Sequence, residues 1–331
     1  MNAAHAALPR VSRRVALGAL AGAAAMLRYP AAKAAGKLRV GKAVIENPGY
    51  IPLDIGRRFG IFAKAGVEIE ALDFSGGAKI AQALAAGAVD ISLSGGPDMA
   101  FTAKGAPQIA IATIASSPAF MGISVAQESP ARSADDLKGK KIGVTSVGSL
   151  TYWLVEELNR VKGWTEGDRA QPVAIGGSPT TAFAALKSGA VDASVGSIQV
   201  GYQLEEQHAG RLLLTISDYV AHLEMFVIFA STETIRRDPD SVRRFLRGWF
   251  DTVAFMKSHR AETVRVLMEV IGYSAAIAER TYDGLIGHFS VDGRFEPQAL
   301  AALRSSFVDL KLLDPSDDMA KLYTQEFLPK A

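Results

Sequence analysis

Cysteine is absent from all 331 residues of the chain, and histidine occurs only five times. Without cysteine the protein has no disulfide, no thiolate nucleophile, no cysteine-bound metal and no cysteine for lipid attachment. Four histidines follow the first 34 residues, and they share no metal-ligand spacing, so we expect surface or packed side chains rather than ligands. These four are His208, His222, His259 and His288.

Sequence motifs of nucleotide-binding loops and of serine nucleophiles are missing as well. No G-x-G-x-x-G or Walker sequence occurs in the chain. The nearest approach to a nucleophile elbow is "GVTSVG" at 143–148, which has one residue too many for G-x-S-x-G. We therefore expect a binding protein rather than an enzyme, with no metal and no cofactor.

Long apolar runs are missing too, and the one apolar run near the start is short. Residues 1–34 hold five basic residues and no acidic one, and the run "VALGALAGAAAML" of thirteen residues follows Arg13-Arg14. The segment "AAKAA" then offers Ala32 and Ala34 as an A-x-A cleavage site. A membrane span needs roughly 20 apolar residues, so an anchor is excluded. The order predicts a signal peptide of the twin-arginine type, cleavage near Ala34 and a periplasmic protein.

An excess of charge of either sign is lacking once this leader is set aside. The whole chain has 36 basic and 34 acidic residues, a net charge of +2. Subtracting the five basic residues of 1–34 leaves 31 against 34, or −3, over 297 residues. Such a balance gives no case for a nucleic-acid or anionic-membrane surface. The remaining length suffices for two lobes with separate cores.

Apolar strands alternate with amphipathic helices along the mature chain, which predicts parallel sheets with helices on both faces. Strands are expected at 38–45, 67–73, 90–94, 108–115, 140–145, 171–175, 192–196, 211–216 and 224–231. From Glu233 onward the pattern is helical throughout, and such a tail must pack on another part of the protein; we expect it to pack on the first lobe. We therefore expect lobe one at 35–120 and 226–331, lobe two at 121–225, and two crossings between them.

One stretch of sequence occurs nearly twice. "ALAAGAVDISLSG" at 83–95 and "ALKSGAVDASVGS" at 185–197 match at seven of thirteen positions. Both run from a helix through Gly-Ala-Val-Asp into a short strand. Chance is one explanation; we favour the same corner built once in each lobe.

Glycine, serine and threonine gather where strands are expected to end and helices to begin. The segments are "FSGGAK" (74–79), "SGGPD" (94–98), "TSVGSLT" (145–151), "GGSPTT" (176–181) and "GS" (196–197). Glycine lets backbone N–H groups approach a ligand, and a helix N-terminus attracts an anionic or acceptor-rich group. Each serine or threonine taken alone is also a good N-cap. Five such corners in two lobes favour a shared ligand cleft at the carboxyl ends of the strands.

The runs "GIFAKAGVEIE…FSGGAKIAQALAAGAVDISLSGGPDMAFTAKGAP" and "SADDLKGKKIGVTSVGSLTYWLVEEL" resemble the solute-binding proteins of ABC importers for nitrate, taurine and aliphatic sulfonates. This TauA/SsuA group also takes in proteins similar to the thiamine-pyrimidine synthases, and the resemblance covers nearly the whole mature chain. It implies an α/β periplasmic-binding-protein fold of type II, with two doubly wound lobes joined by a two-strand hinge. We expect the helical C-terminal region to pack on lobe one. The resemblance implies a membrane permease as the partner, and we expect the protein to be a monomer.

The resemblance and the corners together give a set of expected ligand-binding residues. They are Asn47, Gly49, Tyr50, Ser75, Gly76, Gly77, Ser94, Gly95, Gly96, Pro97, Asp98, Phe120, Thr145, Ser146, Ser149, Thr151, Trp153, Ser178, Thr180, Ser197 and Phe226.

The charge of the ligand is left open by these residues. Helix N-termini suit an anion such as a sulfonate, taurine or nitrate, yet the loops carry Glu46 and Asp98 and only one nearby cation, Lys79. Asp98 either complements a helix dipole or accepts from an amine, as in taurine or an aminopyrimidine. The aromatic residues of the set either wall the ligand or belong to the core.

Three functions are therefore weighed. The expected one is capture of a small organic or inorganic anion for an ABC importer. The alternatives are binding of a thiamine-precursor-like pyrimidine or another aromatic solute, and a periplasmic sensor or scaffold without an import role. The enzymatic relatives, the pyrimidine synthases, carry a cysteine-rich motif that this chain lacks.

Overall fold

The computed structural model describes residues 37–330 of the chain. The expected leader and its cleavage site near Ala34 lie outside the described residues. Within 37–330, none of the helices combines the length and apolar character that a bilayer crossing requires.

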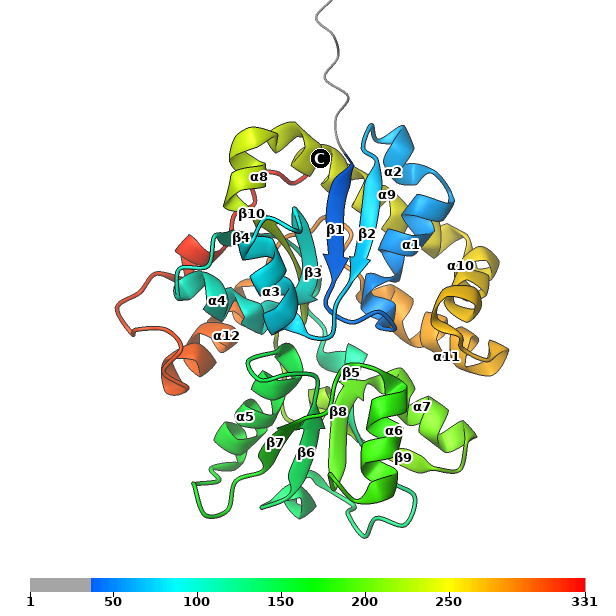
Figure 1. Ribbon diagram of the computed structural model, residues 1–331, viewed down its shortest axis with the longest axis vertical. Helices are drawn as coiled ribbons and strands as arrows, with labels where there is room; N and C mark the ends of the chain where they lie inside the picture. Colours follow the sequence, from blue (N-terminus) through cyan, green and yellow to red (C-terminus); the bar gives the residue numbers. More distant parts are fainter. Residues whose placement is uncertain (1–36, 331) are drawn as a thin grey trace, which may run out of the picture. The chain divides into compact units, whose positions relative to one another are not determined.

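Two five-stranded sheets form the framework, and their strands follow the same spatial order (Figure 1). The first sheet has the order β2-β1-β3-β10-β4, and the second β7-β6-β8-β5-β9. The strands are β1 Leu38–Lys42, β2 Ile69–Asp73, β3 Ile91–Gly95, β4 Gln108–Ala115, β5 Met121–Ala126, β6 Lys141–Val144, β7 Gln171–Ala174, β8 Ala193–Ser197, β9 Gly210–Thr215 and β10 Phe226–Ser231. This confirms the expected two-lobe α/β architecture, and we call the sheets with their helices the first and second lobes.

The fourth strand in each order is antiparallel to both of its neighbours, whereas the first three are parallel to one another. It is β10 in the first sheet and β5 in the second. Each of these strands is where the chain arrives from the other lobe, because β5 follows β4 and β10 follows β9. The two arrivals make a hinge of two chain segments. The carboxyl ends of the parallel strands of the two sheets face each other across it (Figure 1).

Helices connect the parallel strands and form the whole C-terminal region. The α-helices are α1 Ile51–Arg58, α2 Ile61–Lys64, α3 Gly77–Ala85, α4 Met99–Ala103, α5 Leu150–Lys162, α6 Pro179–Ser188, α7 Ile198–Glu206, α8 Thr232–Arg237, α9 Pro239–Ser258, α10 Arg260–Val266, α11 Ala275–Leu285 and α12 Pro297–Asp309. Short 3₁₀ helices are η1 Pro48–Tyr50, η2 Gly96–Asp98, η3 Pro118–Phe120, η4 Ala134–Leu137, η5 Ile216–Asp218, η7 Ile286–His288 and η8 Met319–Leu322, and η6 Leu267–Ile271 is a π-helical turn.

Local sequence sets the ends of the second-lobe helices. The hydroxyls of Ser149 and Ser178 accept from the backbone N–H of the third residue of α5 and α6, at 3.4 and 3.2 Å. Both are N-caps, which satisfy one of the free donors at a helix start. Gly163 and Gly189 follow the two helices with φ of +66° and +70°, the left-handed conformation that glycine adopts without strain.

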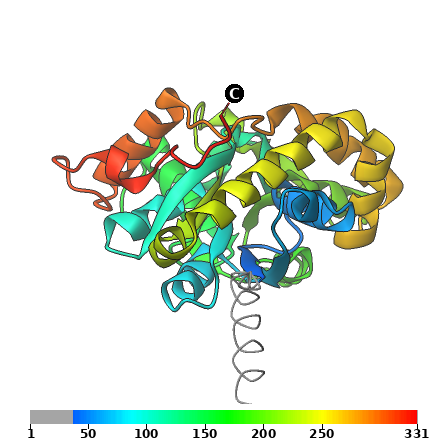
Figure 2. The same ribbon diagram turned by 90° about the horizontal axis from the view of Figure 1, so that it is seen from above.

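The C-terminal helices pack on the first lobe, as expected, and two of them also touch the second. The long helix α9 lies against α1 and α2 (Figure 2). In this contact Phe62 stacks on Phe245, with ring centroids 5.4 Å apart. Helix α12 reaches α5 of the second lobe, where Ser306 donates to the carboxylate of Glu157 at 2.7 Å. Arg280 of α11 lies 3.5 Å above the ring of Tyr202 on α7. The helical tail therefore bridges the two lobes.

The repeated stretch forms the same corner in both lobes, at the ends of the strands away from the cleft. The carboxylate of Asp90 accepts from the backbone N–H of Arg39 at 3.0 Å, and that of Asp192 from Lys141 at 2.9 Å. The backbone N–H of each aspartate in turn donates to the carbonyl of the same partner, at 2.9 and 2.8 Å. Each aspartate thus joins the start of its own strand to the start of the neighbouring parallel strand. The repeat therefore contributes to the assembly of the sheet.

Candidate functional site

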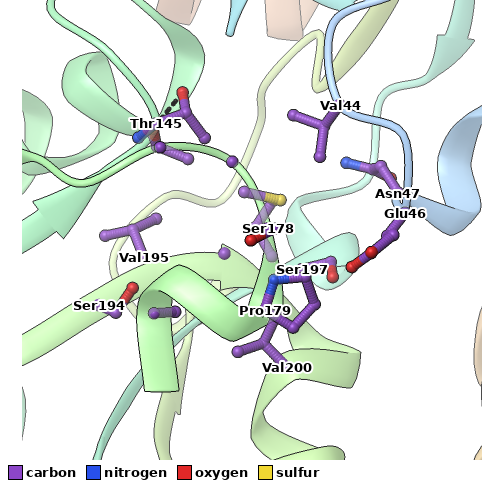
Figure 3. Close-up of a pocket in the computed structure, with 16 residues that line it drawn as sticks. Val44, Glu46, Asn47, Thr145, Ser178, Pro179, Ser194, Val195, Ser197 and Val200 are labelled. Atoms are coloured by element: carbon purple, nitrogen blue, oxygen red, sulfur yellow. Dashed lines mark hydrogen bonds between the residues drawn. The ribbon is translucent and has the colours of Figure 1, made fainter. Parts of the chain in front are cut away.

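A cavity opens between the lobes at the carboxyl ends of the strands, with a free volume of about 50 Å³ (Figure 3). We call it the interlobe cavity. Its first-lobe wall is the loop after β1, and its second-lobe wall comes from the loops after β6, β7 and β8. The lining residues are Val44, Glu46, Asn47, Met121, Thr145, Thr151, Gly176, Gly177, Ser178, Pro179, Ala182, Ser194, Val195, Gly196, Ser197 and Val200.

Asn47 and Glu46 form the polar part of the first-lobe wall. The side-chain oxygen of Asn47 accepts from the backbone N–H of Gly49 at 2.8 Å and thereby caps η1. Its amide nitrogen points into the cavity in Figure 3. The carboxylate of Glu46 lies on the side of Ser197, and burial raises the pKa of Glu46 above its ordinary value. The first lobe therefore offers one donor and one acid.

Tyr273, from the helical tail, supports this wall at Glu46. Its hydroxyl donates to the backbone carbonyl of Glu46 at 3.4 Å. The side chain is buried, and burial followed by the negative charge of Glu46 raises the pKa of Tyr273 far above its ordinary value. It stays a neutral phenol. Tyr273 comes from the helical tail, more than two hundred residues from Glu46, so no local sequence pattern points to it.

Three hydroxyls on the second-lobe wall form a closed group. Thr145 donates to Ser149 at 2.8 Å, and Ser149 donates to the carbonyl of Ser146 at 2.7 Å. Thr151 accepts from the backbone N–H of Thr145 at 2.8 Å and lies 3.0 Å from both other hydroxyls. Each hydroxyl has one proton. With the protons of Thr145 and Ser149 used in this way, Thr151 has the one proton that can go either to a neighbouring hydroxyl oxygen or to an acceptor in the cavity.

Two helix N-termini complete the second-lobe wall. Ser178 and Pro179 begin α6, and Ser197 begins α7, where its hydroxyl makes no capping bond. The first N–H groups of a helix have no partner within the helix, and its N-terminus carries about half a positive charge. No lysine or arginine lines the interlobe cavity among residues 37–330. The cavity is thus rich in neutral donors and contains one acid.

The structure brings five of the residues expected from sequence into this cavity: Asn47, Thr145, Thr151, Ser178 and Ser197. Ser149 lies directly behind the two threonines. Thr180 is exposed on α6. Lining residues that the sequence reading did not single out are apolar or glycine, such as Val44, Met121 and Val200, together with Ser194 of β8.

The expected residues 75–77 and 94–98 lie where the lobes touch. Gly76 packs so closely on Ser146 that a Cβ would collide with the serine hydroxyl, and Gly95 faces Leu150. A Cβ on Gly96 would overlap the backbone carbonyl of Glu224 in the hinge. The hydroxyl of Ser75 accepts from Lys79 at 2.8 Å on the surface. Their small size allows the contact between the lobes.

Three of the expected aromatic residues form a cluster beside the hinge. The ring centroids of Tyr50 and Phe226 are 5.2 Å apart, and those of Phe120 and Phe226 are 5.4 Å apart. All three side chains are buried, and Gly49 lies against the Phe226 ring. None lines the interlobe cavity. Trp153 lines a different cavity, between α4 and α5.

Two buried carboxyl groups accompany the contact between the lobes. Asp98 accepts from the Ser94 hydroxyl through one oxygen, and its other oxygen has no partner within residues 37–330. Burial raises the pKa of Asp98 to about 7. In the hinge, Glu224 accepts from the backbone N–H of Glu296 at 2.7 Å, and burial raises its pKa to about 7 as well. Both groups therefore titrate near neutral pH.

Groups of three or more histidine, aspartate or glutamate side chains that could hold a metal ion do not occur in residues 37–330. The polar groups that line the interlobe cavity are hydroxyls, one amide, one carboxylate and the backbone donors of two helix starts. Such a cavity suits capture of a small solute.

Two α/β lobes on a two-segment hinge, with a donor-lined cavity between them, define the periplasmic-binding-protein fold. Residues 47–263 match the family model described as NMT1/THI5 like, and the chain belongs to this family. The resemblance expected from the sequence is confirmed. No curated protein matched the chain.

Solved structures of solute-binding proteins share the fold. The periplasmic aliphatic sulphonate binding protein SsuA from Escherichia coli is 21% identical with a TM-score of 0.70, over 87% of this chain and 92% of that one. The alkanesulfonate-binding protein SsuA from Xanthomonas axonopodis pv. citri, bound to MOPS, is 22% identical with a TM-score of 0.73, over 87% and 98%. The periplasmic nitrate-binding protein NrtA from Synechocystis PCC 6803 is 14% identical with a TM-score of 0.69, over 88% and 86%.

Proposed function

We propose that this protein is the periplasmic solute-binding component of an ABC importer and that it captures a small anion in the interlobe cavity. The observation that carries the proposal is the convergence of the starts of α6 and α7 with the Thr151 hydroxyl and the Asn47 amide nitrogen on one small cavity. Sulfonate and nitrate groups present several acceptor oxygens to such donors. The sulfonate- and nitrate-binding structures of the same fold support this class of ligand.

Glu46 favours an anion that also carries an amine. Its carboxylate is the one acid on the cavity wall, and a bare anion would meet it as a like charge. An ammonium group beside Glu46 and an acid group at the helix N-termini would match both walls. An aminosulfonate such as taurine has this arrangement within a few atoms, which agrees with the small free volume of the cavity.

The proposed mechanism is closure of the lobes around the solute. A ligand that contacts the loop after β1 and the starts of α6 and α7 binds both lobes and so favours the arrangement in which they touch. The closed protein, a monomer without enzymatic activity, would then deliver its solute to a membrane permease. A sensor or scaffold of the same fold would close in the same way and would not bind a permease.

The experiment is calorimetric titration with taurine, ethanesulfonate and nitrate. We expect taurine to bind more tightly than ethanesulfonate, and Glu46→Gln to reduce this difference, because the substitution removes the carboxylate that faces the amine. One hydrogen bond to a charged group is worth roughly 1.5–3 kcal/mol, so taurine affinity should fall about tenfold or more. The exposed Glu128→Gln is the matched control. Absence of binding by all three anions would overturn the proposal.

A further inference from the structure

A second cavity lies between the lobes, separate from the interlobe cavity, with a larger free volume of about 220 Å³. Its walls are α4 of the first lobe, α5 of the second lobe and the segment that follows α12. We call it the α4–α5 cavity. We propose that the α4–α5 cavity binds a small aromatic monoanion, a single ring that carries one carboxylate or sulfonate group.

The apolar walls fit an aromatic ring. Phe101 from α4, Tyr152 from α5, and Leu310 and Leu312 from the tail are all half-buried and line the space. An apolar cavity of about 150 Å³ is large enough to hold benzene, so the volume here accommodates one ring with a substituent. Covering half-buried apolar side chains is favourable in proportion to the area removed from water. Size and lining thus agree on the same class of ligand.

Trp153 supplies an unused donor. Its side chain lines the α4–α5 cavity and is only 5% exposed, yet its indole N–H has no hydrogen-bond partner within residues 37–330. Buried indole N–H groups normally find an acceptor, and a buried group without one calls for an explanation. An acidic group on a ring bound against Trp153 would supply the missing acceptor.

The charges at this cavity favour an anion. Lys104 lines it, is exposed, and takes part in no salt bridge among the described residues. Glu156 also lines it, but its carboxylate pairs with Arg169. The charges of Glu156 and Arg169 cancel each other. The positive charge of Lys104 is therefore left to attract an acid group at the mouth of the α4–α5 cavity.

An occupant of this cavity would contact both lobes. The ring of Phe101 on α4 already lies near Gly148, in the loop before α5, where a Cβ would be 3.6 Å from the ring, in ordinary van der Waals contact. A ligand held between α4 and α5 therefore favours the closed arrangement, and occupation of either cavity strengthens binding at the other.

Benzoate and benzyl alcohol, which share the ring and differ in charge, are the probes for this site. We expect calorimetry to detect benzoate binding, and tryptophan fluorescence to change with it. Lys104→Gln should weaken benzoate about fivefold and leave benzyl alcohol unchanged, because an exposed ion pair contributes little more than that. Trp153→Phe keeps a ring in place and removes the donor, so benzoate affinity should fall about tenfold.

Controls separate this site from the proposed function. Lys187→Gln, on the exposed face of α6, should leave benzoate binding unchanged. Glu46→Gln alters the interlobe cavity and should leave it unchanged too. The proposal is overturned if benzoate shows no binding at millimolar concentration, if taurine displaces it, or if Glu46→Gln weakens it. Each of these results can be obtained whether or not the interlobe cavity binds an anion.

Discussion

Residues 90–98, the stretch around β3 in the first lobe, and residues 192–200, the stretch around β8 in the second, begin alike and end differently. Asp90 and Asp192 open the two strands with the same hydrogen bonds, and the equivalent positions along both corners are 102 residues apart. At the far end Asp98, buried and bonded to Ser94, corresponds to Val200, which lines the interlobe cavity. The corner after β3 lines no part of that cavity.

This difference shows that one part of the repeated motif contributes to sheet assembly in both lobes, whereas another part differs in its relation to the interlobe cavity. The aspartate at the start of each stretch holds two strands of the sheet together, and this role is the same in both lobes. The residues that follow the two strands face the other lobe, and there the lobes differ. The residues after β3 form part of the contact between the lobes, whereas those after β8 supply a helix start to the interlobe cavity. A sequence repeat therefore identifies an equivalent position in the fold and leaves its role to the surroundings.

The largest expected effect distinguishes the two opening aspartates. Asp90 is buried and also accepts from the Arg39 guanidinium at 2.9 Å and from Thr234 at 3.1 Å, whereas the Asp192 side chain is 47% exposed. Breaking a buried charge network costs about 3–5 kcal/mol and an exposed bond about 1 kcal/mol. Asp90→Ala should lower the free energy of unfolding by about 3 kcal/mol or more, and Asp192→Ala by about 1 kcal/mol, in urea denaturation. Equal losses would contradict the distinction.

The same aspartate gives a pH dependence at the acidic end. Burial alone would raise the pKa of Asp90, but hydrogen bonds from Arg39 hold the pKa below its ordinary value. Its stabilisation is therefore present above the unfolded pKa near 4 and is lost as pH falls through the folded pKa. Asp90→Ala should remove this acidic part of the stability profile.

The next effect concerns Asp98. Because burial raises the pKa of Asp98 to about 7, the folded protein binds more protons than the unfolded chain between pH 4 and 7. Stability should therefore fall as pH rises through this window and stay flat above it. Asp98→Asn removes the ionisation, and its stability relative to the wild type should rise between pH 5 and pH 8 by on the order of 2–3 kcal/mol. Asp192→Asn is the control, and an unchanged pH profile in Asp98→Asn would count against a neutral Asp98. Glu224 titrates in the same direction, so part of the slope should remain.

The smallest effect on stability and the clearest effect on binding come from the serines. Ser197→Ala removes a half-buried hydroxyl that makes no capping bond at the start of α7, so we expect a change in stability below about 0.5 kcal/mol and a fall in anion affinity of about tenfold. Ser94→Ala removes the buried partner of Asp98, so we expect a loss of about 1 kcal/mol and unchanged affinity. Calorimetry and thermal unfolding of both variants are the measurements. If Ser94→Ala weakened the ligand as much as Ser197→Ala, both corners would face the solute.

Most of the fold follows from local patterns, and one strand shows where they fail. The expected strand at 108–115 agrees with β4 at both ends, whereas β5 was not expected at all. Its sequence "MGISVA" has a glycine and a serine in the middle, which are weak strand formers. Packing favours Gly122, since a Cβ there would lie 2.6 Å from the end of the Leu212 side chain and 3.0 Å from the backbone carbonyl oxygen of Leu214. The strand forms because it pairs with β8 on one side and with β9 on the other, and this pairing depends on tertiary structure.

The site divides in the same way. Ser178 and Ser149 cap the starts of helices, and helix starts can be recognised from sequence, so their place in the fold could be predicted. Trp153 and Phe226 look like candidates for a ligand wall, but whether an aromatic side chain faces a cavity or the core depends on segments distant in the sequence. Tyr273 shows the limit most clearly, because only the folded helical tail places it against Glu46.

The ion pairs between the helical tail and the second lobe make the binding of the solute depend on salt concentration. Arg160 pairs with Asp309 at 3.1 Å and Arg280 with Glu205 at 3.3 Å, and all four side chains are between 33% and 56% exposed. Attraction between such charges is screened over about 8 Å at physiological ionic strength and over less in concentrated salt. Opening the hinge separates these pairs, so dissolved ions ease the opening. The time that a solute stays bound should therefore shorten as the surrounding salt concentration rises, even for a solute that carries no net charge.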